Sequence, residues 1–213
     1  MKRIVRSTLQ TTANLVFFAL IGTAILAVTH ALTEDTIART VEQEKLKLIG
    51  QVLSPASYDN DLLRDSKPLP ADALLGGLPG GSALIARQQG RPVAVVLEAV
   101  AREGYGGNIR LLMAIRADGS VSGVRVVAHK ETPGLGDYIE LGKSDWIRQF
   151  DGLSRTVRTA ADWQVKKDGG QFDYMAGATI TPRAVVKGVH LALQYFDQHR
   201  DELFAPMQEG GPQ

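Results

Sequence analysis

An apolar run near the start of the chain, from Ala13 to Leu32, limits what this part of the sequence can fold into. An α-helix needs about 20 apolar residues to cross a bilayer, and the run has about that length. Basic residues precede it and acidic residues follow it: Lys2, Arg3, Arg6, Glu34 and Asp35. The positive-inside rule therefore predicts a single-pass helix over 13–32, a cytoplasmic N-terminus over 1–12, and a main domain on the periplasmic side of a cell inner membrane.

A cleaved signal peptide is the alternative interpretation of this run. The apolar region of a signal peptide usually has only about 7 to 15 residues, and no Ala-x-Ala pair ends the run here. We therefore prefer the membrane anchor. The following residues, Thr33 to Leu53, have the pattern of a helix that continues the anchor and packs on its own domain.

The composition changes between Ser66 and Gly81, where Pro and Gly gather. Such a composition favours loop or linker, so we predict a membrane-proximal helix and linker over 33–81. Four strand-like segments come next, and they alternate with turn signals at Gly90 and at Asp118-Gly119: 82–86, 93–100, 109–116 and 121–128. Together they predict an antiparallel sheet.

Shorter elements follow the predicted sheet. Ser144 is placed to cap a short helix, and residues 163–165 have the pattern of an edge strand. We predict an α+β domain over 82–204, with a twisted antiparallel sheet and flanking helices, and a flexible tail over 205–213.

The segment from Asp173 to Pro182 combines small residues with a helix start. We predict that the helix begins at Pro182 and that Thr181 caps it, although Thr181 could instead contact a phosphate. Apolar residues then recur at helical spacing: Val185, Val186, Val189, Leu193 and Phe196. The unpaired amides at the start of this helix would favour an anion near Thr179 by roughly 0.3 to 1 kcal/mol.

A second segment, Glu131 to Asp137, places a Pro-Gly turn and another glycine after the last predicted strand. Backbone amides at Gly134 and Gly136 can approach a flat ring closely, because glycine has no Cβ. Turn formation alone also explains these glycines. Several aromatic residues lie near the two segments, but such residues more often belong to a core, and we assign none to a ligand: Tyr105, Tyr138, Trp146, Phe172 and Tyr174.

The two segments together resemble the FMN-binding domain shared by the G subunit of the Rnf/Rsx electron-transport complex and the C subunit of the sodium-translocating NADH:quinone reductase. That family has a motif of the form Asp-x-x-(Ser/Thr)-Gly-Ala-Thr, whose last residue is Thr179 here. The Glu-Thr-Pro-Gly-Leu-Gly element at 131–136 and the Gly-Tyr-Gly-Gly turn at 104–107 are also similar to the family. One residue departs from the pattern, because Ala176 stands where Ser or Thr is usual.

The resemblance implies that a flavin transferase joins FMN through its phosphate to Thr179. It also implies further contacts with the cofactor from residues of both segments: Glu131, Thr132, Gly134, Leu135, Gly136, Gly177, Ala178 and Thr181. The implied function is electron transfer within a complex that moves ions or reduces a redox regulator. The implied partners are the other membrane and peripheral subunits and the lipid bilayer.

Two alternatives stay open at this point. The chain could be the C subunit of the quinone reductase, or a membrane-tethered assembly module that carries no flavin, for which Ala176 is the one hint. Lys166 and Lys167 are interpreted as solvated charges, and Asp173 either belongs to the attachment motif or organises a turn.

Composition excludes several other functions. With 24 basic and 23 acidic residues the net charge is +1, which predicts no nucleic-acid partner. The chain has no cysteine, which excludes iron–sulfur ligation by thiolates, disulfides and a cysteinyl flavin link. The sequence shows no metal-ligand spacing, no independent catalytic set of nucleophile and base, and no Gly-x-Gly-x-x-Gly fingerprint for NADH.

Overall fold

The structure is a computed structural model that describes residues 2–77 and 79–206. It divides into two compact units, Met1–Lys47 and Leu48–Gln213. Most of the tail predicted over 205–213 lies outside the described residues. Helix α1 (Lys2–Val52) forms the first unit, and its last turn belongs to the second.

In the first unit, α1 is continuous through both segments for which the sequence predicts helix. Its apolar side chains between Leu15 and Leu32 are largely exposed, with Phe18 at 69% and Leu26 at 72%. Among the described residues, no helix is both long and apolar enough to cross a membrane. The span predicted over 13–32 is therefore not confirmed.

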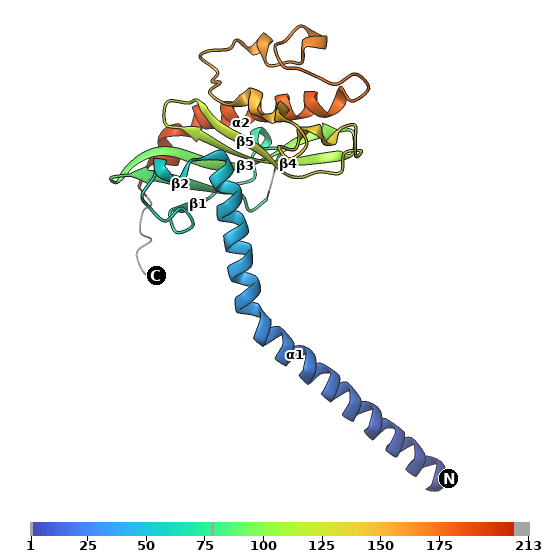
Figure 1. The fold of residues 1–213 in the computed structure, drawn as a ribbon. Helices are drawn as coiled ribbons and strands as arrows, with labels where there is room; N and C mark the ends of the chain where they lie inside the picture. The colour runs from blue at the N-terminus through green and yellow to red at the C-terminus, as the bar shows by residue number, and fades with distance from the viewer. Residues whose placement is uncertain (1, 78, 207–213) are drawn as a thin grey trace. The chain divides into compact units, whose positions relative to one another are not determined.

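The second unit is built on a five-stranded antiparallel sheet in the order β1-β2-β3-β4-β5 (Figure 1). The strands are β1 (Ser66–Pro68), β2 (Ser82–Gln88), β3 (Arg91–Gly104), β4 (Gly107–Arg116) and β5 (Val121–Ala128). The four predicted strands and both turn signals are confirmed. At the turns, Gly90 and Gly119 have φ of 76° and 87°, which glycine adopts at no steric cost.

The segment 66–81 is not only the linker that its composition indicates. It contains β1, which pairs with β2 from Ser66 opposite Leu84 to Pro68 opposite Ser82, and the short 3-10 helix η2 (Ala73–Leu75). Proline at the end of a three-residue edge strand is compatible with pairing on one side. The pattern of residue types missed this strand because it is short and contains no apolar alternation.

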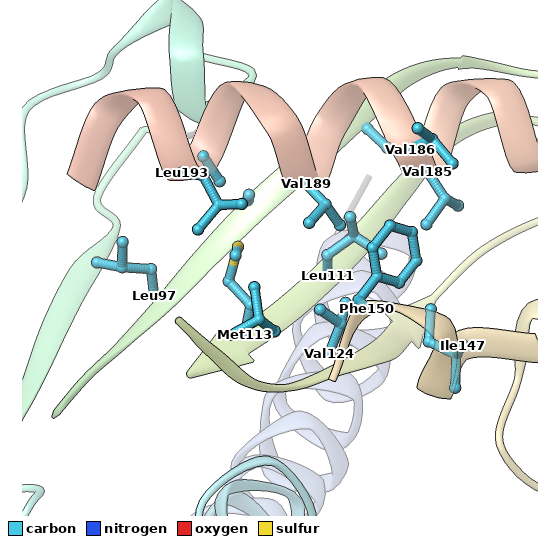
Figure 2. Packing of buried hydrophobic residues seen from close by; sticks show 14 of the residues in the cluster. Leu97, Leu111, Met113, Val124, Ile147, Phe150, Val185, Val186, Val189 and Leu193 are labelled. Carbon is cyan, nitrogen blue, oxygen red and sulfur yellow. The ribbon is translucent and has the colours of Figure 1, made fainter. Parts of the chain in front are cut away.

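Helix α2 (Ile180–Phe204) covers one face of the sheet, as Figure 2 shows at Val185, Val189 and Leu193. These side chains pack with Leu111 and Met113 of β4 in the larger of two apolar clusters. The helix lies close to the sheet at Gly188, where a Cβ would come within 2.8 Å of the Ala101 Cβ. This face is the main core, and the predicted apolar stripe of the helix is confirmed.

The last turn of α1 covers the opposite face, through Ile49 and Val52. A Cβ at Gly123 of β5 would lie only 2.9 Å from the Val52 Cα. Nearby, the buried Arg125 donates from Nη2 to the Gln51 carbonyl over 2.8 Å. Burial lowers the pKa of this guanidinium. Both faces of the sheet are thus covered. This explains why β3 and β4 contain runs of consecutive apolar residues, since successive side chains of a strand point to opposite faces.

The remaining elements are short 3-10 helices: η1 (Pro55–Ser57), η3 (Asp137–Ile139), η4 (Asp145–Phe150), η5 (Ala160–Asp162) and η6 (Lys166–Asp168). The predicted cap at Ser144 is confirmed, since its hydroxyl accepts from the Trp146 amide over 3.1 Å. The edge strand predicted over 163–165 is wrong. Val165 makes only a single parallel bridge with Phe172, and no ladder continues from it.

Candidate functional site

The start of α2 differs from the predicted start. The helix begins at Ile180, two residues before Pro182, and Thr179 is its N-cap residue. Proline is tolerated throughout a first helical turn, because its missing N–H would have no partner within the helix there. The hydroxyl of Thr179 makes no capping hydrogen bond, and this half-buried side chain sits directly at the end of the helix where free amides gather.

Thr181 is not the helix cap. Its side chain is 1% exposed and donates from Oγ1 to Oε2 of Glu131 over 2.5 Å. The other carboxylate oxygen of Glu131 accepts from the Gly106 amide over 3.0 Å. One buried carboxylate therefore connects the start of α2, the turn between β3 and β4, and the loop after β5.

The loop that follows β5 is a tight turn closed by its own backbone. The amides of Leu135 and Gly136 donate to the Thr132 carbonyl over 3.1 and 3.0 Å. Gly134 has φ of 76°, and its amide donates to Oδ1 of Asp137 over 2.8 Å. Three hydrogen bonds thus stabilise this turn.

Gly136 lies against the hydrogen bond between Glu131 and Thr181. A Cβ there would come within 2.9 Å of Oε2 of Glu131 and of Oγ1 of Thr181. A Cβ atom essentially never lies within 3.0 Å of a non-bonded heavy atom, so only glycine fits here without displacement of its neighbours. Gly136 therefore lies close to protein atoms here, and the approach of its amide to a flat ring stays a prediction.

These segments enclose a pocket of about 270 Å³. Its lining comprises Tyr105, Glu131, Thr132, Leu135, Gly136, Gly177, Ala178, Ile180 and Thr181. Ligand pockets typically have volumes of about 300 to 1,000 Å³, so this one suits part of a cofactor better than all of it. Most of its surface is apolar, and Glu131 is the acidic residue among the residues that line it.

Seven of the nine predicted site residues line this pocket. Thr179 lies in sequence between the lining residues Ala178 and Ile180, and Gly134 shapes the loop without lining the pocket. The predicted set omitted Ile180 and Tyr105, whose side chains are 46% and 71% exposed. An exposed aromatic within a Gly-Tyr-Gly-Gly turn was the available signal for Tyr105.

The segment before Thr179 is fixed by side chains of the neighbouring 3-10 helices. Trp146 donates its indole N–H to the Asp173 carbonyl over 2.7 Å, and the Asp173 amide donates to Gln149 over 2.9 Å. The Met175 amide donates to the Tyr138 hydroxyl over 3.3 Å. The Asp173 carboxylate forms an ion pair with Lys166, and both side chains remain more than half exposed, so Lys166 is a solvated charge with an acidic partner.

The described part of the chain offers little support for metal binding or for nucleophilic catalysis. It contains no group of three or more His, Cys, Asp or Glu residues that could hold a metal ion. The buried aromatic residues Tyr138, Trp146 and Phe172 belong to the core, and burial raises the pKa of the Tyr138 hydroxyl. The pocket can bind and orient a ligand, and it presents no activated nucleophile.

Comparison with known proteins points to the same part of the chain. The family model described as an FMN-binding domain matches residues 104–194, which include every residue of the pocket. A second model, described as the RnfG N-terminal region, matches residues 1–52, the extent of α1.

The chain is also similar to curated proteins over nearly its whole length. It is 48% identical to the G subunit of the ion-translocating oxidoreductase complex of Pseudomonas aeruginosa, over 97% of this chain and 96% of that protein. It is 44% identical to the protein of the same name from Shewanella oneidensis, over 90% of each chain. The corresponding protein of Cereibacter sphaeroides is 46% identical over 89% of this chain and 84% of its own length.

Proposed function

Because the chain belongs to the family of G subunits of ion-translocating oxidoreductase complexes, we propose that it carries FMN and passes electrons within an Rnf-type complex. Its partners are then the other subunits of that complex. One observation carries the proposal: the two segments that resemble the flavin family, separated by some forty residues of sequence, line one pocket within the match to the FMN-binding domain.

The residues of the pocket fit an isoalloxazine ring and a phosphate. Leu135 and Ile180 offer apolar surface to a flat ring, and Gly177, which has open space where a Cβ would lie, leaves the backbone open to close approach. The free amides at the start of α2 favour an anionic group beside Thr179. Bound flavin would supply one- and two-electron chemistry, while these side chains hold the ring and limit its contact with water.

We further propose that the linkage is covalent, through the phosphate to the Thr179 hydroxyl, and that a flavin transferase forms it. Support comes from the position of Thr179, whose hydroxyl is free of capping and stands at the helix end that attracts anions. Attachment would keep FMN at a high local concentration in a compartment where free cofactor is diluted. Ala176 lacks the hydroxyl that is usual at its position, but the acceptor hydroxyl of Thr179 is in place.

Membrane attachment through α1 with the second unit in the periplasm is likewise a proposal. Its support is the exposed apolar surface of the first unit, since soluble proteins seldom expose so many neighbouring apolar side chains. Carbonate extraction of native membranes and accessibility of the second unit to added protease in spheroplasts test the two halves of this proposal separately.

Peptide mapping of protein co-expressed with its flavin transferase tests cofactor, linkage and residue together. We expect an FMN-sized mass increment on the peptide that contains Thr179, its loss in Thr179→Val, and its retention in the control Thr156→Val. An increment that survives in Thr179→Val would refute the site. Absence of flavin from the native complex would instead support the assembly-module alternative.

The alternative is that the chain is the C subunit of the quinone reductase. That subunit would use the same FMN-binding pocket, so the pocket does not distinguish the two. The relatives from Pseudomonas aeruginosa and Shewanella oneidensis are named as G subunits, and the match at residues 1–52 is to the RnfG N-terminal region. These two observations favour the Rnf-type assignment. Co-purification of the native protein identifies the assembly directly.

A further inference from the structure

This inference rests on the proposed function. We infer that Glu131 lowers the reduction potential of the bound flavin, because its buried carboxylate disfavours negative charge on the reduced ring. Glu131 is the one acidic residue among the described residues that line the pocket. Its side chain touches the start of α2 and the Gly106 turn, and it is a positioning and tuning residue rather than a catalytic one.

The environment of this carboxylate is unusual for a charged group. Glu131 is only 5% exposed, and its two hydrogen-bond donors, Thr181 and Gly106, are both neutral. The ion pairs formed by the described residues include none to Glu131, and His129, two positions before it, is hydrogen-bonded to Glu140. Burial of a carboxylate without a cation costs stability, because two neutral hydrogen bonds replace only part of its hydration.

A purely structural role does not require that cost. A glutamine has nearly the same shape, its carbonyl could accept from the Gly106 amide, and its amide group could donate to the Thr181 hydroxyl. The bridge between the three segments would then remain without a buried charge. What glutamine cannot supply is the negative charge next to the cavity.

The chemistry of flavin gives this charge a direct effect. Reduction of the neutral ring by two electrons, with uptake of one proton, leaves one net negative charge on the ring. In a pocket of low effective dielectric, a fixed carboxylate opposes that charge more strongly than it would in water. Glu131 would therefore lower the reduction potential and make the bound cofactor a stronger electron donor.

Spectroelectrochemical titration of the flavinylated full chain at pH 8 tests this inference. We expect Glu131→Gln to shift the midpoint potential upward by at least about 30 mV, a tenfold change in the equilibrium constant of a two-electron couple. Glu131→Asp keeps the charge and should stay near the wild type. Asp137→Asn is the matched control. It removes a carboxylate from the same loop, and Asp137 does not line the pocket.

The salt dependence of the shift provides a second criterion. The effect of a buried charge should persist at about 1 M salt, whereas the effects of surface charges are screened. An unchanged potential in flavinylated Glu131→Gln, or equal shifts in Glu131→Gln and Asp137→Asn, would overturn the inference. Neither result would affect the proposed function, which fails only if the wild-type chain carries no flavin.

If Glu131→Gln does not fold, Thr181→Val provides the deciding measurement. This variant keeps the carboxylate and removes the shorter of its two hydrogen bonds, so its charge is less compensated. The midpoint potential at pH 8 should then fall below that of the wild type. A potential that is unchanged or raised in this variant contradicts the inference.

Discussion

The indole N–H of Trp146 donates to the backbone carbonyl of Asp173 over 2.7 Å and so connects η4 with the segment that leads to Thr179. The second tryptophan, Trp163, is as deeply buried, but its indole N–H has no hydrogen-bond partner among the described residues. The two residues therefore form a matched pair for measuring what this hydrogen bond contributes.

Trp146→Phe should destabilise the second unit by about 1 kcal/mol more than Trp163→Phe. Both changes remove similar apolar volume, and only the first leaves a carbonyl without its donor. Urea denaturation measures the difference, and hydrogen exchange locates it. We expect faster exchange over 173–178 in Trp146→Phe alone, and equal exchange in both variants would contradict this.

Gly136→Ala should disrupt the pocket, because the new Cβ would meet Glu131 and Thr181 at 2.9 Å. We expect a loss of about 1 to 3 kcal/mol in the free energy of unfolding, together with reduced flavin content. Gly142→Ala is the control, since a Cβ there meets open space. Equal flavin content in both variants would show that the loop adjusts without consequence.

Gly188→Ala should destabilise the packing of α2 on β3, although alanine favours a helix over glycine by about 1 kcal/mol. The added Cβ would lie 2.8 Å from the Ala101 Cβ and 3.0 Å from its Cα, and backbone there cannot move freely. Gly50→Ala in α1 meets only Pro55 at 4.0 Å and should be neutral or stabilising. Thermal melting tests this difference: the melting temperature should fall in Gly188→Ala and should stay the same or rise in Gly50→Ala.

His190 should make stability depend on pH. Burial, and secondly the charge of Arg155, lower the pKa of this imidazole below its usual value of 6.5. The unfolded chain then binds the proton more tightly than the folded chain, so stability rises with pH between the folded pKa and about 6.5. Below this window the contribution of the neutral histidine is lost.

The variant His190→Gln tests that assignment. Its free energy of unfolding should vary less between pH 7.5 and pH 5 than that of the wild type. Because His190 stacks on Trp163 with ring centroids 5.2 Å apart, the variant should also lose some stability at every pH. An unchanged pH dependence would place the responsible group elsewhere.

Sequence patterns predicted the parts of the fold that depend on local chemistry. The Gly90 and Asp118-Gly119 turns specify their hairpins, because positive φ at glycine matches the twist of the paired strands. The stripe from Val185 to Phe196 identifies the face of α2 that packs on the sheet. The same logic failed for Ser66–Pro68, where pairing with β2, rather than any residue preference, makes the strand.

The sequence by itself determined four of the five strands, the long C-terminal helix and the motif that places Thr179 beside it, since each depends on residues close together in the chain. Only the tertiary structure decided that Thr181 bonds to Glu131, fifty positions away, instead of capping its own helix. A hydroxyl can satisfy its hydrogen bond in either way, and the choice depends on which acceptor the fold brings within reach. The same packing decides that the carboxylate of Glu131 is buried beside the pocket, because burial is a property of the assembled core and not of the residue type.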